Sequence, residues 1–111
     1  MQRPKNILEV GTAVGFSALF MSEYAPADCR ITTIEKYEKR IPIARENFRR
    51  AGRENQITLL EGDAADILKE LQESYDLIFM DAAKGQYIHF LDDVLRLMKP
   101  GSVLVSDNVL Q

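Results

Sequence analysis

The sequence predicts a protein of the α/β class, with a parallel β-sheet of about five strands and helices on both of its faces. Two observations predict it. Short apolar runs recur at intervals of about two dozen residues, and they lack the strict alternation of strands that have one face in water. The segments between them carry apolar residues at helical spacing. The predicted strands are residues 6–10, 30–35, 57–61, 76–80 and 102–106.

A glycine-containing turn follows the first predicted strand. Gly11 and Gly15 let the backbone turn sharply and approach a ligand without a Cβ in the way. Their spacing differs from that of the glycine loops that bind dinucleotides, which favours an adenosyl ligand without phosphates. A plain strand–helix turn can carry the same two glycines, so this signal is weak when taken alone.

The second predicted strand ends in Glu35. A carboxylate at this point can accept hydrogen bonds from both hydroxyls of a ribose. It does not distinguish S-adenosylmethionine (SAM) from NAD, because both contain that ribose. In the next helix we expect Pro42 in the first turn and Gly52 just past the end. Its apolar stripe is Tyr37, Ile41, Ala44, Phe48 and Ala51.

The third predicted strand leads into Gly62, Asp63 and Ala64. A carboxylate and backbone N–H groups at this point could bind the edge of an adenine. Asp63 fits equally well as the N-cap of a short helix over residues 64–71. A further helix carries the stripe Tyr87, Leu91, Val94, Leu95 and Met98, and we expect it to stop at Lys99-Pro100-Gly101.

The fourth and fifth predicted strands are followed by side chains with oxygen donors: Asp81, then Asp107 and Asn108. Adjacent parallel strands would bring these groups to one edge of the sheet, and oxygen donors without His or Cys suit Mg²⁺ better than zinc. Lys84 follows Asp81 closely. A neighbouring cation and partial burial would both lower the pKa of Lys84, which would make it a plausible base. A solvated surface lysine is the alternative.

Composition limits the kinds of protein that this chain can be. A chain of 111 residues fits one domain, and a net charge of −3 argues against nonspecific binding to a phosphate backbone. The single cysteine and the lack of a long apolar run lead us to expect a cytoplasmic protein without a membrane segment. Residues 36–53 hold seven cations. We interpret them as a solvated helix face, with a contribution to RNA binding left open.

Together these motifs resemble the catechol and caffeoyl-CoA type of class I SAM-dependent O-methyltransferases. Residues 7–17 (ILEVGTAVGFS) resemble the first SAM motif, 33–35 (TIE) the ribose motif and 61–64 (EGDA) the adenine region. The resemblance implies a Rossmann-like fold and a SAM site formed by Glu9, Gly11, Ala13, Gly15, Ser17, Glu35, Asp63, Ala64 and Asp81. It also implies Asp81, Asp107 and Asn108 as ligands of Mg²⁺ or another hard divalent cation, and Lys84 with Asp81 as catalytic residues.

The implied reaction is methyl transfer from SAM to a hydroxyl of an acceptor with vicinal oxygens. Residues 81–87 and 106–110 look most like bacterial members, some of which methylate 5-hydroxyuridine in tRNA. A small catechol or a caffeoyl-CoA-like phenol is the alternative acceptor, although Ala83 stands where the catechol enzymes carry a bulky aromatic residue. Two other classes stay open: a nicotinamide-dependent oxidoreductase and a non-catalytic module that binds SAM or a nucleotide.

The resemblance covers nearly the whole chain, residues 1–111, as a methyltransferase core. Family members also have helices before the first strand and further strands after the fifth. We therefore expect a fragment whose fifth strand has an exposed edge. The family further implies a homodimer for the longer protein.

Overall fold

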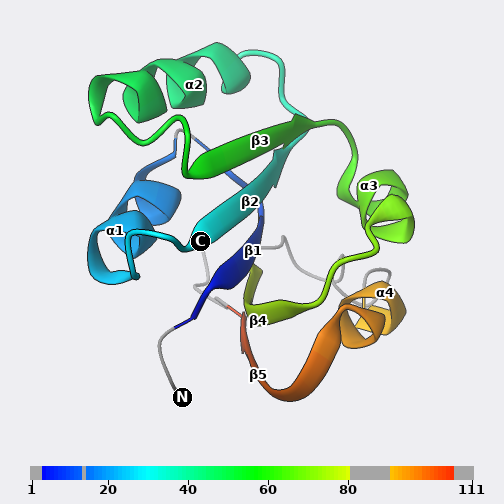
Figure 1. Cartoon of the computed structure of the whole chain (residues 1–111). Helices are drawn as coiled ribbons and strands as arrows, with labels where there is room; N and C mark the ends of the chain where they lie inside the picture. The colour runs from blue at the N-terminus through cyan, green and yellow to red at the C-terminus, as the bar shows by residue number, and fades with distance from the viewer. Residues whose placement is uncertain (1–3, 14, 81–90, 107–111) are drawn as a thin grey trace.

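The central sheet has five parallel strands in the order β3-β2-β1-β4-β5 (Figure 1). This computed structural model describes residues 4–13, 15–80 and 91–106. The strands are β1 Asn6–Val10, β2 Arg30–Glu35, β3 Ile57–Glu61, β4 Tyr75–Met80 and β5 Met98–Ser106. The predicted α/β class and parallel sheet are therefore confirmed.

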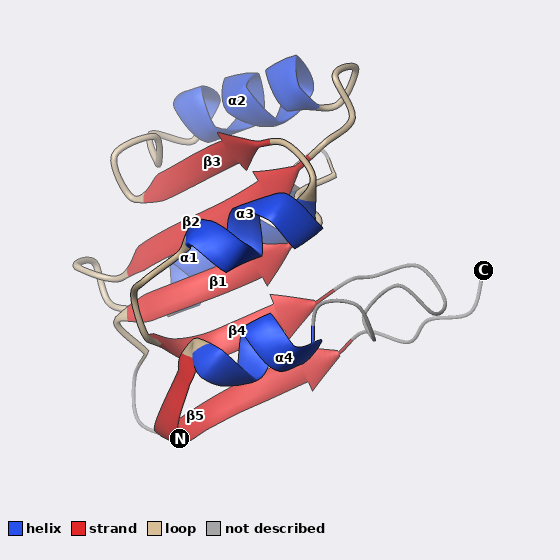
Figure 2. Cartoon of the chain, turned by 90° about the vertical axis from the view of Figure 1, so that its right-hand side faces the viewer, coloured by secondary structure: helices blue, strands red, loops and turns tan. Residues whose placement is uncertain are grey.

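Helices cover both faces of the sheet. They are α1 Phe16–Tyr24, α2 Ile41–Arg50, α3 Ala64–Glu70 and α4 Leu91–Arg96. Figures 1 and 2 show α1 and α2 on one face and α3 and α4 on the other. The strand order explains this division. The chain adds β2 and β3 on one side of β1 and then crosses to β4 on the other side, so the helices before that crossing and those within and after it cover opposite faces.

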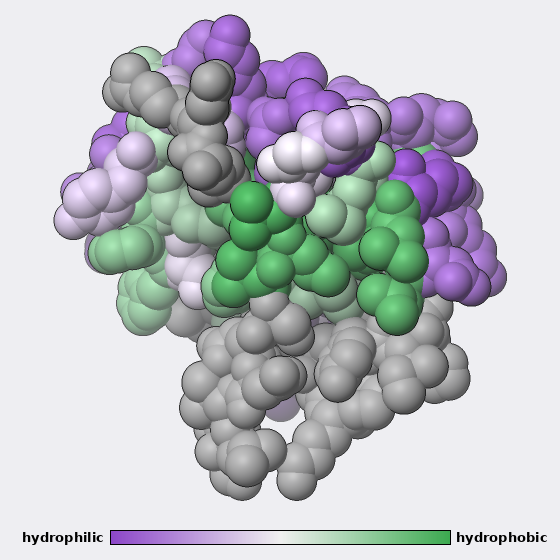
Figure 3. Space-filling view, turned by 90° about the horizontal axis from the view of Figure 1, so that it is seen from below, coloured by the Kyte–Doolittle hydropathy of each residue, from purple (hydrophilic) through white to green (hydrophobic). Residues whose placement is uncertain are grey.

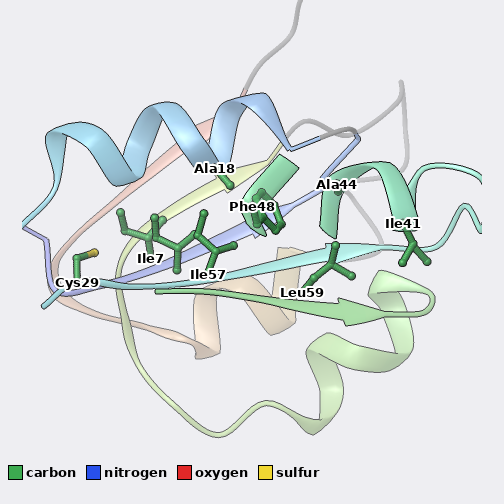
Figure 4. Close-up of a cluster of buried hydrophobic side chains, with 9 residues drawn as sticks. Ile7, Ala18, Cys29, Ile41, Ala44, Phe48, Ile57 and Leu59 are labelled. Atoms are coloured by element: carbon green, nitrogen blue, oxygen red, sulfur yellow. The ribbon is translucent and has the colours of Figure 1, made fainter. Parts of the chain in front are cut away.

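Each face of the sheet has its own apolar core, because successive strand residues point to opposite faces. In β1, Ile7 packs towards α1 and α2, whereas Leu8 packs towards α3 and α4. The first cluster, in part labelled in Figure 4, is Ile7, Ala18, Cys29, Ile31, Ile41, Ala44, Phe48, Ile57 and Leu59. The second is Leu8, Val10, Ile34, Leu68, Tyr75, Ile78, Met80, Val94 and Leu97. Burial on both faces explains why the strands read as continuous apolar runs.

The helix stripes are confirmed in part. Pro42 lies in the first turn of α2, and Gly52 follows its end with a φ of +71°. Ile41, Ala44 and Phe48 are buried, but Tyr37 is 53 % exposed and precedes the helix. In the last stripe, Val94 is buried and Leu95 is exposed; Met98 belongs to β5, and Tyr87 lies outside the described residues.

The prediction that Lys99-Pro100-Gly101 separates a helix from the last strand is wrong in one respect, because these residues lie within β5. Tyr75 pairs with Met98, but Leu77 pairs with Val103, so extra residues bulge out of β5 between the two pairs. Ser102 fixes the bulge: its hydroxyl donates to the Tyr75 carbonyl at 2.7 Å and accepts from the Lys99 N–H at 3.0 Å. Proline and glycine usually end a helix or strand, but Pro100 and Gly101 lie where β5 bends, and Figure 2 shows the bend.

β5 is an edge strand in the described part of the chain, where it pairs with β4 alone. Leu91, Leu95 and Val105, on α4 and β5, are large apolar residues that remain exposed. Figure 3 views this edge from below and shows apolar surface along it. The expected exposed edge of the fifth strand is thus present in the described structure.

Parallel strands end at the same edge of the sheet, so the carboxyl ends of all five strands lie together. The order of connection reverses between β1 and β4, which makes this the topological switch point of the sheet. Ligands of doubly wound α/β proteins bind outside the strand ends at such a point. A ligand site is therefore expected at the loops that follow β1, β2 and β3.

Candidate cofactor-binding site

The loop after β1 has an unusual backbone. Gly11, Ala13 and Gly15 have φ angles of +102°, +51° and +95°. Ala13 is the only non-glycine residue with positive φ in the described part of the chain, and such a conformation is costly for a residue with a Cβ. The N–H groups of Gly11 and Thr12 both donate to the Ile34 carbonyl at 3.0 Å. The loop is thereby tied to the end of β2.

Gly15 is required by packing as well as by its backbone conformation. A Cβ at this position would lie 2.6 Å from Cε1 of Phe48, a buried residue of α2. The predicted role of Gly15, close approach to a ligand, therefore has a second physical explanation within the fold. Ser17, two residues further on, is exposed in the first turn of α1.

Glu35 lies at the end of β2 with 4 % of its surface exposed. Its Oε1 accepts the N–H of Ala13 at 2.6 Å, and its Oε2 accepts the N–H groups of Lys36 and Tyr37 at 3.2 and 3.1 Å. Three N–H donors neutralise much of the carboxylate charge in this buried position. A carboxylate has about four acceptor positions, so hydrogen-bonding capacity is left for a ligand hydroxyl.

A second buried carboxylate, that of Glu9, lies on the neighbouring strand β1. Glu9 of β1 and Thr33 of β2 are paired across the strands, and both are completely buried. The Thr33 hydroxyl donates to Oε1 of Glu9 at 2.6 Å, and the Thr12 hydroxyl lies 2.6 Å from that of Thr33. Sequence analysis missed Thr12 and Thr33. The available signal was that Glu9 and Thr33 are polar residues at the same register of adjacent strands.

The end of β3 is joined to the end of β2. The Gly62 N–H donates to the Glu35 carbonyl at 2.9 Å. Asp63 accepts the Ala65 N–H at 2.8 Å, so the N-cap that we predicted for α3 is confirmed. Asp63 is exposed and Ala64 is half-buried. The described residues predicted for the cofactor are thus placed at the ends of three adjacent strands or in the first turns that follow them.

The predicted metal ligands Asp81, Asp107 and Asn108, and the predicted base Lys84, lie outside the described residues. Within residues 4–13, 15–80 and 91–106, no group of three His, Cys, Asp or Glu side chains could hold a metal ion. The strands that lead to the predicted ligands are described. Met80 and Ser106 are register partners at the adjacent ends of β4 and β5.

The basic segment before and along α2 is largely a solvated surface. Arg45 pairs with Glu61 at 2.6 Å, and Arg49 and Arg50 pair with Glu46 at 2.6 and 3.3 Å. All these side chains are substantially exposed, so each pair contributes little to stability. Separately, no described helix has the length and apolar character that crossing a membrane requires.

The strand order, the glycine loop after β1 and the buried carboxylate ending β2 define a doubly wound α/β protein with a candidate ligand site at its switch point. The sequence profile of a family described as O-methyltransferase matches residues 1–111. The chain belongs to this O-methyltransferase family, which includes the catechol and caffeoyl-CoA enzymes.

Individual relatives agree with this assignment. The chain is 40 % identical to a catechol O-methyltransferase of Niastella koreensis over 111 residues, with 96 % of the chain and 50 % of the relative covered. It is 32 % identical to a caffeoyl-CoA O-methyltransferase of Populus kitakamiensis, covering 99 % and 49 %. Its fold matches the methyltransferase PaMTH1 of Podospora anserina, bound to S-adenosylhomocysteine (SAH), with a TM-score of 0.90, 37 % identity and coverage of 96 % and 47 %. The chain thus spans about half the length of the relatives it matches.

Proposed function

We propose that the protein transfers the methyl group of SAM to a hydroxyl oxygen of its acceptor. The observation that carries this proposal is the Glu35 carboxylate, which is buried at the end of β2 and bonded to the loop after β1. The SAH-bound relative in the same family supports SAM as the methyl donor. During transfer the bond from sulfur to the methyl carbon breaks and a bond from oxygen to that carbon forms, so SAH and a methyl ether are the products.

In this proposal the residues that follow β1, β2 and β3 hold the nucleoside. Glu35 accepts hydrogen bonds from the ribose hydroxyls through its remaining lone pairs. The backbone of residues 11–15 passes beside the sulfonium end of SAM, where Gly11 removes a Cβ from the path. Asp63 and the N–H of Ala64 lie where the adenine edge would be bound. These roles fit the placement of the residues at the switch point.

We further propose that Asp81, Asp107 and Asn108 hold a divalent cation such as Mg²⁺. Two observations support it: Asp81 and Asp107 directly follow the paired residues Met80 and Ser106, and oxygen donors are the ligands that hard cations prefer. A bound cation would supply Lewis-acid assistance and a fixed position for the acceptor oxygens. Lys84 accepts the proton that the acceptor hydroxyl loses.

For the acceptor we propose a molecule with two neighbouring oxygens, in one of two classes. The names of the catechol and caffeoyl-CoA relatives favour a small phenol. The exposed cations Lys36, Lys39 and Arg40, which follow the ribose-binding strand, favour an RNA such as tRNA containing 5-hydroxyuridine. Methylation assays with a catechol and with such a tRNA distinguish the two classes directly.

Calorimetry with SAM, SAH and NAD, each with and without Mg²⁺, tests the proposal. We expect SAM and SAH to bind and NAD not to bind. The opposite selectivity would identify a nicotinamide-dependent enzyme instead. SAM binding without turnover on either acceptor class would favour a binding module.

Variants then test the predicted metal ligands and base. Asp81→Ala and Asp107→Ala should abolish methyl transfer while SAM affinity falls less. Lys84→Ala should lower kcat while Mg²⁺ still binds. Wild-type turnover in either aspartate variant would refute the metal assignment, and wild-type kcat in the lysine variant would leave Lys84 without a catalytic role.

A further inference from the structure

We infer that Thr33 is a positioning residue for the cofactor loop, acting through its hydroxyl to join Glu9 to Thr12. Thr33 follows Ile31 by two residues and so lies on the same face of β2, the face that packs against α1 and α2. The inference rests on the proposed function, because the loop that Thr33 holds is the one assigned to SAM.

The three side chains form a continuous buried chain of hydrogen bonds. Thr33 and Glu9 show no exposed surface, and Thr12 is 2 % exposed. Both hydrogen bonds are short at 2.6 Å. Strand register places Thr33 directly beside Glu9 on β1 and beside Leu59 on β3, in a row otherwise occupied by apolar residues. Polar groups at such a depth are costly unless they bond to one another, so this chain is a specific feature rather than a tolerated exception.

The direction of these hydrogen bonds makes the Thr33 hydroxyl indispensable. The Thr33 hydroxyl donates to Oε1 of Glu9, so its single proton is used in that hydrogen bond. The Thr33 oxygen must then accept the proton of Thr12. Each hydroxyl polarises the next, so the two hydrogen bonds strengthen one another. Valine has nearly the shape of threonine but can make neither bond.

The chain adds a side-chain anchor to a loop that backbone hydrogen bonds also tie to β2. Thr12 precedes Ala13, whose φ of +51° is unfavourable for a residue with a Cβ. Strained residues persist where several contacts over-determine them. Here the Glu35 carboxylate holds the Ala13 N–H, while the Thr12 side chain is held through Thr33. Loss of the second anchor would let the loop leave its binding-competent form.

SAH binding to the whole chain tests the inference, with Thr33→Val, Thr33→Ser and the control Thr58→Val. Thr58 is on the neighbouring strand β3 but exposed. If the competent loop falls to about a tenth of its population, the apparent Kd rises about tenfold. We expect this rise for Thr33→Val, a change within about twofold for Thr33→Ser, and no change for Thr58→Val.

The two Thr33 variants separate positioning from packing. Thr33→Ser removes a buried methyl group and keeps the hydroxyl, whereas Thr33→Val keeps the volume and removes the hydroxyl. A purely structural role would make serine the more damaging change, because it leaves a cavity. Weaker SAH binding by Thr33→Ser than by Thr33→Val, or equal affinity of Thr33→Val and wild type, would overturn the inference.

A double-mutant cycle with Thr12→Val tests the connection between the two hydroxyls. We expect Thr12→Val to weaken SAH binding as Thr33→Val does, and the double variant to be no weaker than either. Effects that multiply would show that the two residues act separately, which contradicts a chain through Thr33. Should Thr33→Val not fold, Thr12→Val and Thr33→Ser still decide the question.

Amide hydrogen exchange provides a measurement that needs no cofactor. Thr33→Val should speed exchange at the N–H groups of Ala13 and Gly15 and leave that of Ile31, in the same strand, unchanged. Unchanged exchange in the loop would overturn the inference whether or not SAH binds. Failure of the wild-type chain to bind SAH, with the predicted loop exchange observed, would count against the proposed function alone.

Discussion

Oε1 of Glu35 lies 2.6 Å from the backbone nitrogen of Ala13, so the last side chain of β2 holds the left-handed residue of the loop after β1. The same carboxylate accepts two further N–H groups from its own strand end. One side chain therefore shapes the loop and, in the proposed function, also accepts hydrogen bonds from the ribose. Its removal should affect the fold and the cofactor together, unlike the removal of a residue that only contacts a ligand.

Glu35→Gln tests this double role. In glutamine an NH2 group replaces one of the two carboxylate oxygens. This group would face either the N–H of Ala13 or those of Lys36 and Tyr37, and these partly buried N–H groups would lose their acceptor. We expect the free energy of unfolding to fall by about 2 kcal/mol and SAH affinity to fall about tenfold or more. Urea unfolding and calorimetry measure the two effects. Glu61→Gln is the matched control, because Glu61 pairs with Glu35 in register but is exposed; unaltered SAH affinity in Glu35→Gln would exclude the ribose contact.

Gly15→Ala should destabilise the fold more than Gly52→Ala. Both glycines have positive φ, but a Cβ on Gly15 would meet Phe48 at 2.6 Å, whereas nothing lies within 4 Å of one on Gly52. The conformational cost alone is about 1 kcal/mol, and overpacking adds about 2 kcal/mol. Urea unfolding of both variants measures the difference. Adding Phe48→Leu to Gly15→Ala should recover part of the loss, and equal losses in the two glycine variants would refute the packing argument.

Asp63 allows the two roles assigned to it to be separated. Asp63→Ala should lower the free energy of unfolding by about 1 kcal/mol, because the N–H of Ala65 loses its cap. Asp63→Ser keeps an oxygen that can cap α3 but lacks the carboxylate, so it should retain most of the stability. If the carboxylate binds adenine, both variants should weaken SAH binding. Wild-type affinity in Asp63→Ser would limit the side chain to capping.

Asp76 should make stability depend on pH in the acid range. A hydrogen bond from Lys99 is the largest cause that lowers the pKa of Asp76, followed by backbone N–H donors of Lys5 and then Asn6. Because the folded-state pKa is the lower one, the stabilisation is complete above the unfolded-state pKa of about 3.9 and is lost as the pH falls through the folded-state value. Asp76→Asn should therefore be less stable near neutral pH and should lose less stability on acidification. Unfolding midpoints measured across this range would contradict the prediction if the two curves were parallel.

Cys29 should be unreactive in the folded protein. Burial is the largest cause that raises the pKa of Cys29 to about 11, and the carboxylates of Asp28 and Asp76 add to it. Little thiolate is present near neutral pH, and the side chain is 1 % exposed. A thiol reagent should react slowly with the native protein and rapidly in denaturant. Fast native-state labelling would show that the end of the sheet around Cys29 opens locally.

The sequence predicted the parallel sheet because its strands are buried on both faces, and apolar runs without alternation have few other structural explanations. It predicted Pro42, Gly52 and the cap at Asp63 because these residue types have specific backbone requirements. It missed the bulge in β5, because Pro100 and Gly101 end elements as readily as they bend them. The contacts of Thr12 and Thr33 were missed for another reason: a threonine in a loop or a strand is common, and only the register of Thr33 with Glu9 shows what this pair of hydroxyls contacts.

The hydrogen bonds described for the cofactor loop come from β1, β2, α1 and the loop itself. β4 and β5 end at the same edge of the sheet, and no hydrogen bond to that loop comes from their described residues. Changes in the sequence after β4 and β5 would then leave the described anchors of the loop in place. Such a division of labour within one sheet would allow a common methyl-donor site to serve chemically different acceptors.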